Sequence, residues 1–153
     1  MRRLLLSLTL ALTLSAVGAS PALAEAPQGA QKAPLFGPFS QGAINIPCAT
    51  GAEPTPETFG FAVFNTPGDE ATLTGEVALT HAAPNSTYRI ELEQVESPFC
   101  IAGSQVGEIT TNMQGRGNLH FTTARNPAAN KFLVEVFNNA VLEFFASPSV
   151  ELD

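Results

Sequence analysis

Hydrophobic and polar residues alternate with a period of two along most of the chain after residue 41. Successive side chains of a β-strand point to opposite faces, so this alternation predicts strands that each bury one face. The alternating segments span residues 42–48, 59–64, 72–81, 88–95, 106–111, 118–124, 131–138, 141–147 and 149–152. Pro, Gly and Asn separate them, and no stretch of ten or more residues keeps a helical period. The pattern therefore predicts an all-β domain of about seven or eight strands.

Short strands with one apolar face bury that face against a second sheet, which predicts an antiparallel two-sheet β-sandwich. The residues expected to face inward include Leu73, Val77, Leu79, Tyr88, Ile90, Leu92, Leu119, Phe121, Phe132, Val134 and Val136. Phe59, Phe61 and Val63 share one face of their strand, and Arg89, Glu91 and Glu93 are expected to face solvent. The clearest predicted hairpin joins residues 106–111 to 118–124, because the turn between them holds two glycines that can adopt positive φ.

Tyr88 is the only tyrosine in the chain and stands at the head of an alternating strand. In Greek-key sandwiches of the immunoglobulin type, such a tyrosine folds back and bonds the backbone a few residues upstream. The spacing of Leu79, Pro84, Tyr88, Ile90 and Leu92 resembles this corner in fibronectin-type and related bacterial immunoglobulin-like domains. The resemblance implies a structural role for Tyr88, with a ligand contact as the alternative. It covers only residues 79–92, and the chain has more strands after the corner and no core tryptophan.

The first 24 residues have the pattern of a secretory signal peptide. Arg2 and Arg3 precede an uncharged apolar stretch, and small residues at Ala22 and Ala24 suit signal peptidase. The apolar stretch is shorter than the ~20 residues of a membrane span. Residues 25–34, rich in Pro, Gly, Ala and Gln, read as a flexible leader before a single domain over 35–153. We expect a soluble, secreted protein, extracellular or periplasmic, with no membrane insertion.

Charge and cysteine content narrow the expected partners further. The signal peptide removes two of seven basic residues and none of fourteen acidic ones, which leaves a net charge of −9. Phosphate backbones and anionic lipids repel such a chain, so we expect no nucleic-acid binding. Cys48 and Cys100 both lie in the exported part, which predicts one disulfide. Free or catalytic thiols are the alternatives, although neither cysteine has a CxxC partner or a neighbouring histidine.

The candidate chemistry is sparse. His81 and His120 are possible zinc ligands, but no HxH or HExxH spacing relates them, and a copper–zinc dismutase would need several more histidines. Glu91 and Glu93 share one strand face with Cα atoms ~6.5–7 Å apart, which roughly suits an inverting glycosidase. Arg89 on that face instead suggests a solvated row of charges. We expect no metal, no cofactor and no catalytic group.

Phenylalanines outside the predicted core form the most suggestive surface candidate. Phe36, Phe39, Phe137, Leu142 and Phe144 make either a second buried layer or an exposed apolar patch for a partner. The sequence thus predicts a non-enzymatic, monomeric extracellular module that binds an extracellular protein or cell-surface component, or serves a structural role. One alternative is a carrier that holds a small apolar ligand between its sheets, and another is a hydrolase using Glu91 and Glu93.

Overall fold

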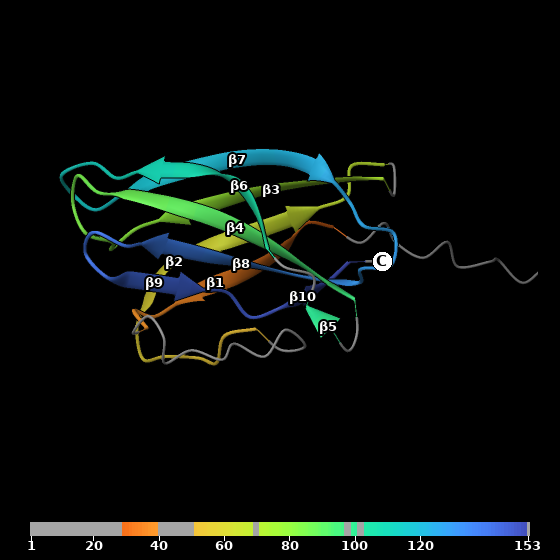
Figure 1. Cartoon of the computed structure of the whole chain (residues 1–153), viewed down its shortest axis with the longest axis horizontal. Coiled ribbons are helices and arrows are strands. Elements are labelled where there is room, and N and C mark those ends of the chain that lie inside the picture. The colour runs from red at the N-terminus through yellow and green to blue at the C-terminus, as the bar shows by residue number, and fades with distance from the viewer. Residues whose placement is uncertain (1–28, 40–50, 69–70, 97–98, 101–102, 153) are drawn as a thin grey trace, which may run out of the picture.

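The computed structural model describes residues 29–39, 51–68, 71–96, 99–100 and 103–152, which form an all-β domain (Figure 1). The strands are β1 (Gln31–Phe36), β2 (Thr58–Asn65), β3 (Thr72–Leu79), β4 (Thr87–Glu96), β5 (Phe99–Cys100), β6 (Ser104–Thr110), β7 (Gly117–Ala124), β8 (Lys131–Asn138), β9 (Glu143–Ala146) and β10 (Val150–Glu151). Every recorded pairing is antiparallel. The described part contains no helix, and so none long and apolar enough to cross a membrane. The predicted all-β, antiparallel class is confirmed.

The strands form one continuous sheet that curls into a nearly closed barrel (Figure 1). Hydrogen bonding follows the order β5-β4-β8-β9-β1-β2-β3-β7, with β6 also paired to β4 and β10 to β8. A single residue pair, Phe36 with Ala146, connects β1 to β9. Through this link the strands form one sheet, whereas the sequence predicted two separate sheets. β6 and β7 lie side by side without a ladder and form the open seam.

The barrel interior is filled by the alternating apolar faces of the strands. Leu73, Val77 and Leu79 of β3 and Phe132, Val134 and Val136 of β8 are buried, as their spacing predicts. Tyr88, Ile90 and Leu92 of β4, which pairs directly with β8, belong to the same core cluster. Complete removal of such side chains from water stabilises the fold by about 1.5–3 kcal/mol each, so these three strands anchor the domain.

In β2 the buried positions are Ala62 and Phe64, whereas Phe61 and Val63 face the outside and are half-buried. Phe59 still packs against the core at the start of the strand. Because the face changes between Phe59 and Ala62, the strand does not bury one alternating set of aromatic residues. The Nζ atom of Lys32 lies 3.8 Å from the Phe61 ring centroid and covers that ring on the outside.

The domain begins earlier than the sequence suggested. β1 starts at Gln31, inside the predicted leader, and Ala33 is buried because β2 pairs with it along the whole strand. The predicted signal peptide, the strand over 42–48 and Cys48 lie outside the described residues. The predicted disulfide therefore lies outside them as well.

The predicted hairpin between residues 106–111 and 118–124 has its tight turn but not its ladder. Asn112 holds the turn through a 2.8 Å bond from its N–H to the Arg116 carbonyl. Beyond the turn, β6 forms its hydrogen-bonded ladder with β4, and β7 forms its ladder with β3. The hairpin prediction is wrong in this respect, because each strand completes its hydrogen bonds with a different neighbour.

Candidate functional site

One end of the barrel carries three loops, and Tyr88 connects the first of them to the strand that follows the third. The loops span residues 80–86, 111–116 and 139–142, and they lie at the left-hand end of Figure 1. The Tyr88 ring is fully buried. Its hydroxyl oxygen accepts the Ala83 N–H at 2.8 Å and its proton goes to Oε2 of Glu143. The side chain thus connects the first loop to the start of β9, five residues upstream and fifty-five downstream.

Burial, and next the hydrogen bond to Glu143, raise the pKa of Tyr88 well above its usual range. The phenol therefore stays protonated and keeps donating throughout the physiological pH range. Glu143 Oε2 also accepts the Ala83 N–H at 3.3 Å, so one carboxylate oxygen serves both groups. This arrangement fixes the loop rather than leaving a reactive hydroxyl in a cleft.

Thr111 secures the same loop from the opposite side. Its hydroxyl donates to the Ala83 carbonyl at 2.6 Å and accepts the Ser86 N–H at 3.0 Å. Backbone bonds from Ala82 to Gly115 and from Asn85 to Asn112 add to the connection. Loop 80–86 is therefore hydrogen-bonded to the start of β9 and to the turn that follows β6. These bonds give this end of the barrel a defined shape.

The three loop-end apolar residues Met113, Val141 and Leu142 are exposed by 74%, 44% and 66%, and they are the large hydrophobic side chains that the described part leaves exposed. Leu142 also has a φ of 57°, a region that branched and bulky residues rarely occupy. The side chain of Asn138 supports the loop by accepting the N–H groups of Ala140 and Val141. A rigid loop end with exposed apolar side chains is suited to contact with another molecule.

The remaining residues of the predicted apolar patch lie elsewhere. Phe36 and Phe144 are buried, with Phe39 and Phe137 packed against them, in a second small cluster on the outer side of β9. The Phe137 and Phe144 ring centroids are 4.6 Å apart. Four of the five patch candidates thus pack together as a second layer, and Leu142 alone is strongly exposed.

A cluster of three carboxylates occupies the outer face of β4 and β8. Glu91 pairs directly with Glu135 across the ladder, and Glu93 follows two residues later on the same face of β4. One carboxylate oxygen from each residue lies within 4.8 Å of the other two. Glu93 is only 8% exposed, in contrast to the solvated position predicted for it. The prediction failed because Gly103 lies against the Glu93 carboxylate, where any Cβ would clash with it.

The charges of this cluster are only partly compensated by neighbouring side chains. Nη2 of Arg89 lies 2.9 Å from Oε1 of Glu91. Burial, followed by the negative charges of Glu93 and Glu91, raises the pKa of Glu135 to about 7. Burial and Glu91 also raise the pKa of Glu93, against the lowering effect of a hydrogen bond from the Gly103 backbone. Oε2 of Glu93 is buried without a hydrogen-bond partner.

This geometry differs from the one that an inverting glycosidase requires. Carboxyl groups in such enzymes stand roughly 6.5–9.5 Å apart so that water fits between them, whereas the oxygens here approach within 4.8 Å. Glu91 is engaged by Arg89 and Glu93 is covered. The cluster can instead share a proton or hold a cation.

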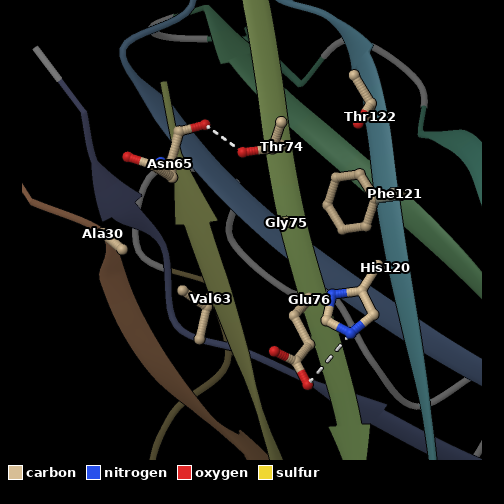
Figure 2. Close-up of a pocket in the computed structure, with 9 residues that line it drawn as sticks. All are labelled: Ala30, Val63, Asn65, Thr74, Gly75, Glu76, His120, Phe121 and Thr122. Carbon is tan, nitrogen blue, oxygen red and sulfur yellow. Dashed lines mark hydrogen bonds and ion pairs between the residues drawn. The ribbon is translucent and has the colours of Figure 1, made fainter. Parts of the chain in front are cut away.

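The two histidines line different hollows. His81 lies with Glu57, Thr58 and Phe59 in an open hollow of about 410 Å³. His120 lines another, of about 340 Å³, on the outer face of β2, β3 and β7 (Figure 2). Figure 2 shows the His120 ring beside Glu76, with Nε2 and Oε1 3.9 Å apart. The structure therefore does not bring the predicted zinc candidates together.

The chain matches no protein-family model, and no curated protein has a significantly similar sequence. The residues described above are thus the basis for any functional conclusion.

Sequence reasoning missed Glu135, Glu143, Thr111 and Met113. Glu135 was the one acidic residue in an otherwise apolar strand, and this was a usable signal. The roles of Glu143 and Thr111 gave no such signal, because their partners at Tyr88 and Ala83 lie far away in the sequence.

Proposed function

We propose that this protein is a secreted, non-enzymatic, monomeric β-sandwich module of the immunoglobulin-like type. Its loop end binds an extracellular protein or a cell-surface component. The observation that carries the proposal is the exposure of Met113, Val141 and Leu142 on two loops at one end of the barrel, where Thr111 and the Tyr88–Glu143 bond fasten loop 80–86. Pre-ordered loops bind with little loss of conformational entropy, and apolar side chains at their tips supply the contact energy.

The immunoglobulin-like assignment is supported by the bond from the Ala83 N–H to the Tyr88 hydroxyl. It spans five residues, as the resemblance to the tyrosine corner implies. Export is supported by the pattern of residues 1–24 and by the strong acidity of the remainder.

A carrier function would require an internal cavity for the apolar ligand. The largest fully buried side chains of the described core include Phe64, Phe132, Phe145, Leu35 and Leu73, which supports a packed core over a ligand cavity. An apolar dye or fatty acid is therefore expected to leave the melting temperature unchanged. A saturable rise would favour the carrier.

The proposal is tested by capture of partners from the host's cell surface. Tagged wild-type protein, a Met113→Ser/Leu142→Ser double variant and a Thr122→Ala control are cross-linked to intact cells and the captured proteins compared. Thr122 is exposed on β7, away from the three loops. We expect the wild type and the control to capture the same components and the double variant to lose them. Equal capture by all three would contradict the proposed loop contact.

The hydrolase alternative has a separate test. A Glu91→Gln/Glu93→Gln variant is compared with the wild type on a panel of polysaccharides. Hydrolysis that disappears in this variant would replace the proposed non-enzymatic function with a catalytic one.

A further inference from the structure

Three carboxylates converge on the outer face of β4 and β8, with less positive charge around them than negative. Glu91 and Glu135 face each other across the ladder, which is an unfavourable arrangement for two like charges. Arg89 forms an ion pair with Glu91 and also lies over the Phe137 ring, and Lys131 lies 3.2 Å from Glu151. Among the described ion pairs, the cluster of three carboxylates therefore has one cationic partner, Arg89.

The second observation is the state of Glu93. Its side chain is more than nine-tenths buried, and its Oε2 atom has no hydrogen-bond partner. Burying a carboxylate oxygen without a partner costs several kcal/mol unless a proton or a cation compensates it. Gly103 lies against the other oxygen, and its backbone hydrogen-bonds the carboxylate. Glu93 thus contributes one carboxylate oxygen to the cluster, while its Oε2 atom lacks a hydrogen-bond partner.

We propose that Glu91, Glu93 and Glu135 bind a calcium ion on the outer face of β4 and β8. Calcium takes oxygen ligands at about 2.3–2.6 Å, so two ligands on opposite sides of the ion can lie about 4.8 Å apart. The three carboxylate oxygens lie within 4.8 Å of one another, and one ion can reach all of them. Glu93 Oε2 gains the partner that it lacks, and the ion offsets the repulsion between Glu91 and Glu135.

The chemistry of the donors selects among metals. An all-carboxylate set favours Ca²⁺, Mg²⁺ or Mn²⁺ over Zn²⁺, which prefers nitrogen and sulfur ligands. Mg²⁺ requires near-ideal octahedral geometry at about 2.0–2.1 Å, which contracts the span across the ion to about 4.2 Å. Mg²⁺ also usually keeps several waters and binds through one or two carboxylates, whereas Ca²⁺ accepts flexible coordination by several protein oxygens, so three convergent carboxylates favour Ca²⁺. The affinity expected of such an extracellular site is about 10⁻⁴–10⁻³ M.

The test is calorimetric titration of the purified full-length secreted protein with CaCl₂ at pH 8, after removal of metals with EDTA. We expect one saturable site and a higher melting temperature in 10 mM CaCl₂ than in EDTA. The Glu93→Gln and Glu135→Gln variants are expected to lose at least tenfold in affinity. Glu53→Gln removes the same charge from an exposed position outside the cluster and is expected to bind as the wild type does.

Circular dichroism of each glutamine variant in EDTA serves as the control for folding. A variant with the wild-type spectrum that no longer binds has lost the site and not its structure. Absence of a saturable site up to 10 mM CaCl₂ would overturn the proposal and leave a shared proton as the compensating charge. Equal weakening in Glu53→Gln would overturn it too, because binding would then depend only on net charge. Tighter binding of MgCl₂ than of CaCl₂ would overturn the choice of calcium. None of these outcomes depends on the loop-end partner, so the two proposals fail separately.

Discussion

At the scale of single residues, Tyr88 joins parts of the chain that lie far apart in the sequence. Its hydroxyl group accepts from Ala83 and donates to Glu143, and the ring packs at 5.8 Å from Phe145 in the core. A buried phenol without these partners would destabilise the fold. The position of the tyrosine in the sequence therefore also determines the position of loop 80–86.

Replacing Tyr88 with phenylalanine keeps the buried ring and removes only the hydroxyl. We expect the free energy of unfolding to fall by about 1–2 kcal/mol, because the hydrogen bond from the hydroxyl to the Glu143 carboxylate is lost. Oε2 of Glu143 then keeps the Ala83 N–H as a donor. Urea denaturation of Tyr88→Phe, Glu143→Gln and the double variant gives the coupling energy between the two residues. Additive effects would show that the pair does not act as a unit.

Leu142 is a second residue whose conformation calls for explanation. A bulky residue at φ 57° costs about 1–2 kcal/mol relative to the usual helical or extended regions, and glycine would avoid this cost. We expect Leu142→Gly to raise the free energy of unfolding by roughly 0.5 kcal/mol, since greater freedom of the unfolded chain offsets part of the gain. The same variant is expected to capture less partner. A more stable protein with unchanged capture would show that the Leu142 side chain has no part in binding.

Glu135 gives the protein a pH-dependent stability in the absence of divalent metal. Its pKa is raised from 4.5 to about 7, so the folded state binds the proton more tightly than the unfolded state. The associated stability is complete below pH 4.5, falls as the pH rises to 7, and stays low above that. Relative to the wild type in EDTA, Glu135→Gln is expected to be about 1–3 kcal/mol more stable at pH 8 and equally stable near pH 4.5.

The measurement for Glu135 is urea denaturation of both proteins at intervals between pH 4.5 and 8. Taking the difference between them removes the titration of groups that do not interact with Glu135, and leaves that of Glu135 and the carboxylates coupled to it. If the difference in free energy of unfolding between the two proteins did not change with pH, the raised pKa of Glu135, and the burial and neighbouring charges that cause it, would be contradicted.

At the scale of the elements, glycines decide how closely the seam between β6 and β7 can approach. A Cβ atom on Gly107 would lie 2.7 Å from a methyl group of Leu119, and one on Gly117 would lie 2.5 Å from Ile109. Beyond the start of β6, Gln94 of β4 spans the seam by donating to the Ala124 carbonyl and accepting the Asn126 N–H. The seam is therefore held by side chains and close packing where a ladder is missing.

We expect Gly107→Ala to lower the free energy of unfolding by about 1–3 kcal/mol, because the added methyl group displaces Leu119. Gly68→Ala is the matched control, since Gly68 also has a positive φ but no atom within 4 Å of the added Cβ. The difference between the two melting temperatures isolates the cost of the close approach. Equal losses would show that backbone strain alone, and not the packing of the seam, explains the effect.

The two faces of β4 and β8 carry different kinds of side chain. Their inward residues build the core, and their outward residues include the three carboxylates and Phe137 of the second apolar cluster. Alternation predicted the first face well. The outward face of β4 was misjudged at Glu93, because alternation assigns a direction to a side chain and does not reveal what covers it.

At the scale of the whole molecule, the barrel is closed at the end opposite the loops by the C-terminal residues. β10 pairs with the start of β8, and Leu152 is buried while its carbonyl oxygen accepts a hydrogen bond from Arg125. The loop end and the C-terminal end thus differ in character, and only the former exposes large apolar side chains among the described residues.

The predicted export concerns the whole chain and is testable directly. Expression of the full chain in a secreting host is expected to release a product that begins at Glu25, because Ala22 and Ala24 suit signal peptidase. Mass spectrometry of the product in the medium or periplasm measures the cleavage site. Retention of residues 1–24 on the mature protein would contradict the predicted signal peptide.

The period-two pattern by itself determined that the protein is built from antiparallel strands and which residues of β3, β4 and β8 form its core. This succeeds because burial of one strand face is a local property that every second residue records. Only the tertiary structure decided that the strands join into one nearly closed sheet, that β6 and β7 pair with different partners, and that Glu135 stands opposite Glu91. Those facts depend on which strands become neighbours, and contacts between residues far apart in the chain leave no periodic trace in a single sequence.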